Sequence, residues 1–219
     1  MLIGVDVSHH NGAVLDLLAG HHIDFVIAKA TEGITFKDSK FDGNMQSAKL
    51  FNLLKGAYHY VNTEPQYMNE FRAYQEAKHF VSYVRPYGDC LLALDFEEKH
   101  MLSQQGVNYL GGVAQFVKDM TGTPPLIYAS ESVIKQFDFT PCIKVGCGLW
   151  AAKWKKNVCP EIEHLSKDDY VSASAKQFGV VAIQQISSKA KIGGVEYNLD
   201  VDIANMNMTA WHKYANPRL

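Results

Sequence analysis

The sequence predicts an α/β fold in which eight strands close into a barrel, and three observations favour it. Short apolar runs recur along the 219 residues, segments of helical periodicity separate the first of them, and polar residues repeatedly follow the runs. Beyond about residue 137 the helical periodicity is lost, although apolar runs continue. A closed barrel whose last three strands lack full helical cover explains this pattern. An open doubly wound sheet is the alternative, but no glycine-rich phosphate loop follows the first strand.

The strands are predicted from apolar runs of a length typical of buried strands. These runs cover residues 2–6, 24–30, 54–60, 90–96, 125–129, 147–152, 180–186 and 197–202. Polar loops that contain Gly and Ser separate the last three, so we expect no regular helices there.

The helices are predicted over residues 13–19, 39–52, 65–85, 103–120 and 130–137, with a short helical segment at about 208–216. Periodicity is clearest over 65–85, where apolar residues recur at three- and four-residue steps and Pro65 fits the first turn. Three glycines, Gly106, Gly111 and Gly112, weaken the segment 103–120, but one apolar stripe persists through it. No linker or repeat is visible, so we expect a single domain over residues 1–219.

The charge balance argues against polyanionic partners. With 21 basic and 23 acidic residues the formal net charge is −2, so we expect no binding to nucleic acid or to an anionic membrane. No stretch approaches the roughly 20 apolar residues that span a bilayer. The N-terminus enters a strand without the basic and apolar regions of a signal peptide, which predicts synthesis in the cytoplasm.

Cysteine and histidine spacing predicts neither a metal site nor a cofactor. Cys90, Cys142, Cys147 and Cys159 lack metal-binding spacing, so we expect reduced, mostly buried thiols, with a bridge between Cys142 and Cys147 as the alternative. The adjacent histidine pairs at 9–10 and 21–22 lack the H-E-x-x-H spacing. His10 is expected beside Asp6 on the rim of the barrel.

The stretch 91–98, L-L-A-L-D-F-E-E, carries the main chemical signal. Because side chains alternate along a strand, Asp95 and Glu97 should share one face, and Phe96 should point into the opposite packing layer. Two buried carboxyls at close range cannot both ionise easily, so one should hold a proton near neutral pH and be able to donate it. Acid-catalysed glycoside cleavage needs such a donor. The alternative is an ordinary carboxylate at the start of a loop.

Polar residues recur where the predicted strands end, which in a parallel barrel is one rim. They are Asp6, Lys29, Glu32, Tyr58, Tyr60, Asp95, Glu97, Tyr128, Ser130, Trp150, Trp154, Gln184, Gln185, Asp200 and Asp202. An acidic cleft rich in aromatic side chains is typical of a carbohydrate site, although each aromatic residue could instead pack in the core. Lys29 and Glu32 are expected to form a structural ion pair rather than to act in catalysis.

Seven segments spread over nearly the whole chain carry a resemblance to a known family. They are D-V-S-H-H-N-G (6–12), F-V-I-A-K-A-T-E-G (25–33), K-G-A-Y-H-Y (55–60), L-D-F-E (94–97), P-L-I-Y-A-S (125–130), L-W-A-A-K-W (149–154) and L-D-V-D (199–202). In this order they resemble family 25 of the glycoside hydrolases, the Chalaropsis-type lysozymes found among phage endolysins and bacterial autolysins. The resemblance implies an incomplete TIM-like barrel of five β-α units followed by three strands.

The resemblance also implies an activity, hydrolysis of the β-1,4 bond between N-acetylmuramic acid and N-acetylglucosamine in peptidoglycan, without a cofactor. It makes Glu97 the general acid and places Asp95, Asp6 and Asp200 beside it, with Asp202 as the alternative if the register of the last strand slips by two. We expect further substrate contacts from seven other residues of the rim. These are Tyr58, Tyr60, Tyr128, Trp150, Lys29, Gln185 and Asp202.

Several alternatives stay open at this level. A retaining reaction would use the substrate's acetamido group as the nucleophile, whereas an inverting one would use Asp6 or Asp200 to activate water. A non-catalytic glycan-binding barrel and a chitinase-like endo-N-acetylglucosaminidase are the rival functions, but the longer acidic run of chitinases is absent here. In the seventh strand Gln184 and Ile186 stand where the family usually has aromatic residues, which leaves substrate preference open.

The expected biological setting follows from the same resemblance. The partner would be the glycan strand of bacterial peptidoglycan, met by a monomer that acts on the wall after release from the producing cell. This fits a phage or prophage endolysin, and an exported autolysin is the alternative. No separate wall-binding domain is recognisable in residues 1–219.

Overall fold

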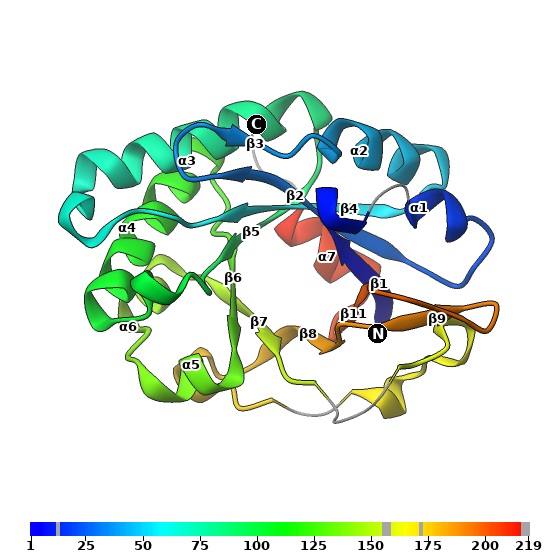
Figure 1. Cartoon of the computed structure of the whole chain (residues 1–219). Helices are drawn as coiled ribbons and strands as arrows, with labels where there is room; N and C mark the ends of the chain where they lie inside the picture. Colours follow the sequence, from blue (N-terminus) through cyan, green and yellow to red (C-terminus); the bar gives the residue numbers. More distant parts are fainter. Residues whose placement is uncertain (12–13, 155–158, 171–172, 216–219) are drawn as a thin grey trace.

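In the computed structural model of the chain, the described residues are 1–11, 14–154, 159–170 and 173–215. Within them, eight strands form a closed barrel, seen nearly end-on in Figure 1. The strands are β1 (Leu2–Val7), β2 (Phe25–Glu32), β4 (Leu54–Tyr60), β5 (Leu91–Asp95), β6 (Leu126–Ser130), β7 (Gly148–Ala152), β8 (Val181–Ser187) and β11 (Asp200–Ala204). Because β1 pairs with both β2 and β11, the ring closes. The predicted barrel is therefore confirmed, and the open sheet is excluded.

The last strand runs in the opposite direction to the others, which the pattern of apolar runs does not reveal. Neighbouring strands from β1 through β2 to β8 are parallel, whereas β11 is antiparallel to both β8 and β1. A parallel return would need a crossover of a dozen or more residues, usually with a helix. Here the hairpin of β9 (Ala190–Ile192) and β10 (Val195–Tyr197) fills the connection instead.

This hairpin also corrects the predicted strand over 197–202. Gly193 and Gly194 turn the chain with φ angles of 57° and 82°, a left-handed conformation that favours glycine. Residues 195–197 are thereby used in β10, and the barrel strand begins only at Asp200. A two-residue strand, β3 (Phe36–Lys37), adds to the edge of β2 near the rim.

In the described part of the chain, helices cover the ring of strands along its top and left in Figure 1 and leave β8 and β11 without a helix outside them. They are α1 (Val14–Leu17), α2 (Phe41–Leu50), α3 (Glu70–Val84), α4 (Gln104–Thr121), α5 (Glu131–Gln136) and α6 (Thr140–Val145), and α7 (Met208–Tyr214) follows β11. Between β7 and β8 the described residues form only short 3-10 turns, at Ile162–His164, Lys167–Asp169 and Lys176–Phe178. The expected loss of helical cover over the last strands is confirmed.

Two helix predictions need correction. The segment 65–85 is divided, because Pro65 begins a separate 3-10 turn and α3 starts only after Asn69, whose side chain accepts a hydrogen bond from the Arg72 backbone N–H at 2.9 Å. The helix α6 was not predicted. Its signals are Pro141 in the first turn and Gly146 directly after the end, at a φ of 96°.

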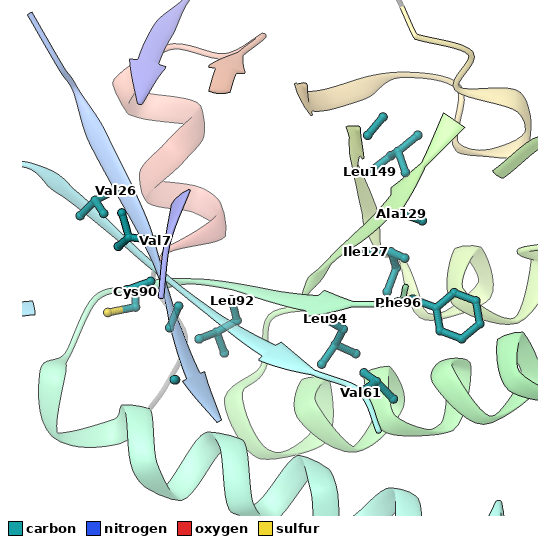
Figure 2. Close-up of a cluster of buried hydrophobic side chains, with 14 of the residues drawn as sticks. Val7, Val26, Val61, Cys90, Leu92, Leu94, Phe96, Ile127, Ala129 and Leu149 are labelled. Atoms are coloured by element: carbon teal, nitrogen blue, oxygen red, sulfur yellow. The ribbon is translucent and has the colours of Figure 1, made fainter. Parts of the chain in front are cut away.

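Buried side chains form two separate layers. Outward-facing strand residues pack against the helices, and Figure 2 shows Leu92, Leu94 and Phe96 of this outer layer near Ile127 and Ala129. The inner layer fills the barrel. At the end where the parallel strands begin, Trp211 of α7 packs on Phe25, with ring centroids 4.8 Å apart, and so closes that end. The opposite end remains available for a site.

The four cysteines are free thiols, with Cys90, Cys142 and Cys147 buried. The alternative disulfide between Cys142 and Cys147 is therefore absent. No helix among the described residues has the length and apolarity to cross a membrane.

Candidate active site

Strand alternation brings the Asp95 and Glu97 carboxyls to one cleft, as the sequence predicts. Leu91 and Ala93 belong to the inner layer of β5, whereas Phe96 belongs to the outer layer. Asp95 and Glu97 continue the inner series at the rim. Asp95 is only 6 % exposed, whereas Glu97 is open to solvent. The two acids therefore occupy unequal positions, one on the floor of the cleft and one at its mouth.

The cleft has an inner and an outer part. The inner part, of about 240 Å³, is lined by Asp6, Tyr58, Asp95, Glu97, Tyr128, Trp150, Trp154, Gln185 and Asp200. The outer part adds Ser8, His10, Asn11, Lys29, Glu32, Tyr60 and Glu98 and shares residues with the inner part. The structure thus brings together all the sequence-predicted catalytic and substrate-binding residues except Asp202.

Asp202 lies beneath the cleft rather than in it. The pairing of β1 with β11 sets Asp200 opposite Asp6 at the rim and Asp202 opposite Gly4, one layer deeper. The Asp202 side chain is fully buried, and its Oδ1 accepts a hydrogen bond from Trp150 Nε1 at 2.8 Å. We therefore correct the expectation that Asp202 contacts substrate. It fixes the indole of Trp150 instead.

Gln185 connects three elements of the cleft. Its Nε2 donates to Asp6 Oδ2 at 2.8 Å, and its Oε1 accepts from Tyr128 OH at 3.0 Å and from Trp154 Nε1 at 2.8 Å. The amide is thereby fixed between β1, β6 and the segment after β7. Gln185 lines the cleft as predicted, but its polar atoms already have protein partners.

Burial and mutual repulsion raise the pKa of the acids in the floor. Burial, followed by the charges of Glu97 and Asp6, raises the pKa of Asp95 well above its usual value, and Lys29 opposes this. Burial and the neighbouring Asp202 raise the pKa of Asp6 in the same way. For Asp200, burial together with Asp6 and Glu97 raises the pKa to about 8. Burial and mutual repulsion thus favour the protonated form of these floor acids.

Burial also raises the pKa of Glu97, although Lys29 acts against the shift and Glu98 adds to it. The charge of Glu97 adds to the raised pKa of the more deeply buried Asp95. Burial is the main cause of the raised pKa in both acids.

Lys29 and Glu32 form the ion pair that the sequence suggested, with Nζ and Oε2 2.8 Å apart. The Lys29 ammonium also lies 4.5 Å from the ring centroid of Tyr60, and Glu32 accepts a second hydrogen bond from Asn62 at 2.9 Å. These bonds lower the pKa of Glu32 although its partial burial acts in the opposite direction. A fixed positive charge thus borders the acidic cleft.

Aromatic rings form the walls of the inner cleft. Trp150 is buried and packs edge-on against Tyr128 and Tyr58, with ring centroids 4.7 Å and 6.3 Å away. Trp154 is 54 % exposed, so its face is open to a ligand while its N–H is held by Gln185. The sequence placed Trp154 at a strand end but did not single it out as a substrate contact. The sequence feature that could have identified Trp154 is its position shortly after β7.

The histidines do not gather around a metal position. Within the described part of the chain, no cluster of three or more His, Cys, Asp or Glu side chains could hold a metal ion. His9 binds Asp38 through Nδ1 at 2.7 Å, and His10 lines the outer cleft as expected.

Comparison with known proteins agrees with this arrangement. Residues 5–194 match the family described as Glycosyl hydrolases family 25. YegX from Escherichia coli K12 is 31 % identical over 111 residues, which are 50 % of this chain and 39 % of YegX. Lysozyme M1 from Streptomyces globisporus is 36 % identical over 59 residues, which are 26 % of this chain and 20 % of that protein. The chain thus matches less than half the length of these curated relatives.

The fold also has solved counterparts. The catalytic domain of endolysin ply40, from bacteriophage P40 of Listeria monocytogenes, superimposes with a TM-score of 0.75 at 20 % identity. The match covers 99 % of this chain and 98 % of that domain. At this identity the likeness establishes the shared fold.

Proposed function

The chain belongs to family 25 of the glycosyl hydrolases, and from that premise we propose that it is an N-acetylmuramidase. Its substrate is peptidoglycan, and the bond cleaved is the β-1,4 bond from N-acetylmuramic acid to N-acetylglucosamine. One observation carries this proposal: four carboxyls, those of Asp6, Asp95, Glu97 and Asp200, meet in an aromatic-walled cleft of a family member. Glycoside cleavage by acid catalysis generally uses a pair of such carboxyls.

Glu97 is the general acid in this proposal. It is the acid at the mouth of the cleft, where a glycosidic oxygen can reach it, and its raised pKa keeps the proton available at higher pH than for a free Glu. Lys29 favours the carboxylate that remains after the proton is given to the leaving group. Activity should therefore decrease as the pH rises through the pKa of Glu97.

Asp95 positions the substrate in this proposal. Among the described residues, its buried Oδ1 has no hydrogen-bond partner, although the carboxyl lines the cleft. An unpartnered buried oxygen is costly, and a polar group of the substrate relieves that cost. The 2-acetamido group beside the scissile bond is the polar group we assign to it.

The central test is lysis of purified bacterial cell walls, followed by the decrease in turbidity. We expect Glu97→Gln to lose at least about a hundredfold in rate, because general acid catalysis contributes about 10² to 10⁴. Glu64→Gln, an exposed acid outside the cleft, is the matched control and should keep wild-type activity. Binding of Glu97→Gln to the walls should persist. Substantial lysis by this variant would refute the assignment of Glu97.

Mass spectrometry of the released fragments distinguishes the rival functions. A new reducing end on N-acetylmuramic acid supports a muramidase, whereas one on N-acetylglucosamine indicates a glucosaminidase. Binding to the walls without any released fragment indicates a glycan-binding barrel. Either of the last two results would overturn the proposal.

We further propose that the protein acts as a monomer on the cell wall, without a nucleic-acid or membrane partner, after release from the cell that makes it. The near-neutral charge supports the absence of polyanionic partners. The likeness to the endolysin ply40 catalytic domain supports a phage or prophage origin. Lysis of intact cells from outside, compared with lysis after expression in the host cytoplasm, tests this setting.

A further inference from the structure

A second groove, of about 600 Å³, lies on the outer face of α3, away from the acids. We name it the α3 groove. One wall is a stripe of α3 that repeats every three or four residues, and the other is built from β3, α2 and the turn that follows α3. Its lining residues are Ile34, Lys37, Asp42, Phe71, Tyr74, Gln75, Lys78, His79, Ser82, Tyr83, Pro86 and Tyr87. The proposed lysozyme chemistry does not use this face.

Exposed aromatic rings mark one end of the α3 groove. Phe71 is 69 % exposed and Tyr74 is 37 % exposed, one helical turn apart on α3. Large apolar side chains that gather on a surface usually serve a ligand, because their exposure to water is unfavourable. Polar side chains at Gln75 and Ser82 line the same stripe. Flat rings bordered by hydrogen-bonding groups suit the faces and hydroxyls of sugar rings.

The charges of the α3 groove favour an anionic ligand. Lys37 and Lys78 line it, and neither forms an ion pair with another described residue. Their ammonium groups lie 4.7 Å and 5.9 Å from the ring centroids of Tyr83 and Tyr74. Asp42 is the acid in the lining, and its Oδ1 accepts hydrogen bonds from the Tyr83 and Tyr87 hydroxyls. The lining therefore sets two lysine ammonium groups against one carboxylate, and the excess positive charge can pair with carboxylates of a ligand.

The α3 groove begins where the cleft ends. Phe36 of β3 separates the two: its ring lies 5.5 Å from Lys29 Nζ in the cleft, and its backbone oxygen is 2.8 Å from His79 Nε2 in the groove. A polymer that leaves the cleft past Lys29 and Glu32 therefore has to cross only the two-residue strand β3 to enter the groove.

We propose that the α3 groove is a second binding site for peptidoglycan, in which sugar rings stack on Phe71 and Tyr74 and carboxylates of the stem peptides pair with Lys37 and Lys78. The inference rests on the proposed function for the identity of the polymer. The site retains the enzyme on an insoluble strand while the cleft acts on a neighbouring bond. A short soluble fragment that fills only the cleft gains nothing from it.

The first experiment measures binding to insoluble sacculi in the Glu97→Gln background, where no cleavage disturbs the equilibrium. Removal of both rings, Phe71→Ala with Tyr74→Ala, should weaken binding about tenfold, as loss of aromatic anchors does at other sites. Leu50→Ala, an apolar residue 77 % exposed on α2, is the matched control and should bind unchanged. Equal binding of the double variant and its parent would overturn the proposal.

The charges are tested in the same assay. Lys37→Gln with Lys78→Gln should weaken binding at low salt and flatten its salt dependence, because two contacts with carboxylates are lost. Lys49→Gln, an exposed lysine on α2, is the control and should leave the salt dependence unchanged. If binding of the double lysine variant has the same salt dependence as binding of its parent, the assigned charge pairing is wrong.

The second experiment compares two substrates with Glu97 intact. The Phe71 and Tyr74 double variant should clear sacculi more slowly, yet hydrolyse a soluble tetrasaccharide fragment at the wild-type rate. An equal loss on both substrates would place the defect in the cleft or the fold and overturn the proposal. If the wild type cleaves neither substrate, and the double variant still binds sacculi more weakly than its parent, the proposed function fails but the α3 groove remains a binding site.

Discussion

At the scale of single residues, the cleft depends on side chains held from below. Gln185 binds Asp6, Tyr128 and Trp154 at once, so an acid and two aromatic walls share one anchor. Trp154 shows the consequence most clearly, because its ring is 54 % exposed while its N–H is fixed at 2.8 Å from Gln185. A ring held at one edge presents its face to a sugar without losing much freedom on binding.

Replacing Trp154 should affect substrate binding more than chemistry. We expect Trp154→Ala to raise KM for a soluble glycan about tenfold with little change in kcat, because a stacking face is lost but the acids stay in place. Trp154→Phe keeps a ring without the N–H and should be intermediate. Tyr67→Ala removes an equally exposed ring outside the cleft and is the control. A selective decrease in kcat would show that Trp154 acts on the reacting atoms instead.

At the scale of elements, packing explains two of the glycines that weaken the helical pattern of α4. A methyl group on Gly106 would lie 1.9 Å from the Met101 backbone oxygen, and one on Gly111 would lie 2.7 Å from Pro141 Cβ. These positions need the absence of a side chain so that α4 can approach its neighbours. Gly112 differs, because a methyl group there would meet Ala73 Cβ at an ordinary 3.6 Å.

We therefore expect alanine substitutions at the two adjacent glycines to have opposite effects on stability. Gly111→Ala should lower the free energy of unfolding by about 1 to 3 kcal/mol, because α6 must move away from α4. Gly112→Ala should raise it by about 0.5 to 1 kcal/mol through better helix propensity. Each variant is the control for the other, and urea unfolding followed by circular dichroism measures both. Changes of the same sign would contradict this packing of α4.

At the scale of the whole molecule, the carboxyls of the barrel interior couple stability to pH. Asp200, with a pKa of about 8 against 3.8 for a free Asp, binds a proton in the folded protein that the unfolded chain has already released. Between these two values, stability must fall as the pH rises. Acids with a lowered pKa act in the opposite direction, but Glu131, at about 2, loses its contribution only in stronger acid. Asp6, Asp95 and Asp202 have pKa values raised by burial and add to the decrease.

The protein should therefore melt at a lower temperature at pH 8 than at pH 5. Asp200→Asn keeps a neutral side chain and should be more stable than the wild type at pH 8, with a melting temperature higher by several degrees. At pH 5 the difference should be smaller. Glu64→Gln is the control and should show the wild-type pH dependence, as measured by differential scanning fluorimetry. An unchanged slope in Asp200→Asn would exclude Asp200 as a source of the coupling.

The amino-acid sequence alone specifies the eight strands, the loss of helices after the fifth β-α unit and the positions of the rim acids. These features are local, since a buried strand appears as a short apolar run and alternation fixes which side chains share a face. For the same reason Asp95 and Glu97 can be assigned to one cleft, and Asp6 and Asp200 to the same rim, from their places in the chain. The family resemblance adds the expected reaction and the role of Glu97 as general acid.

Contacts between residues far apart in the chain set the remaining features. The antiparallel pairing of β11 places Asp200 in the cleft and Asp202 one layer below it, a difference that the motif L-D-V-D cannot show. Unequal burial, which arises from packing of many strands, separates the floor acid Asp95 from the exposed acid Glu97. The α3 groove likewise needs α2, β3 and α3 to meet. Local pattern fixes which face a side chain takes, whereas distance and burial are set only when the whole barrel closes.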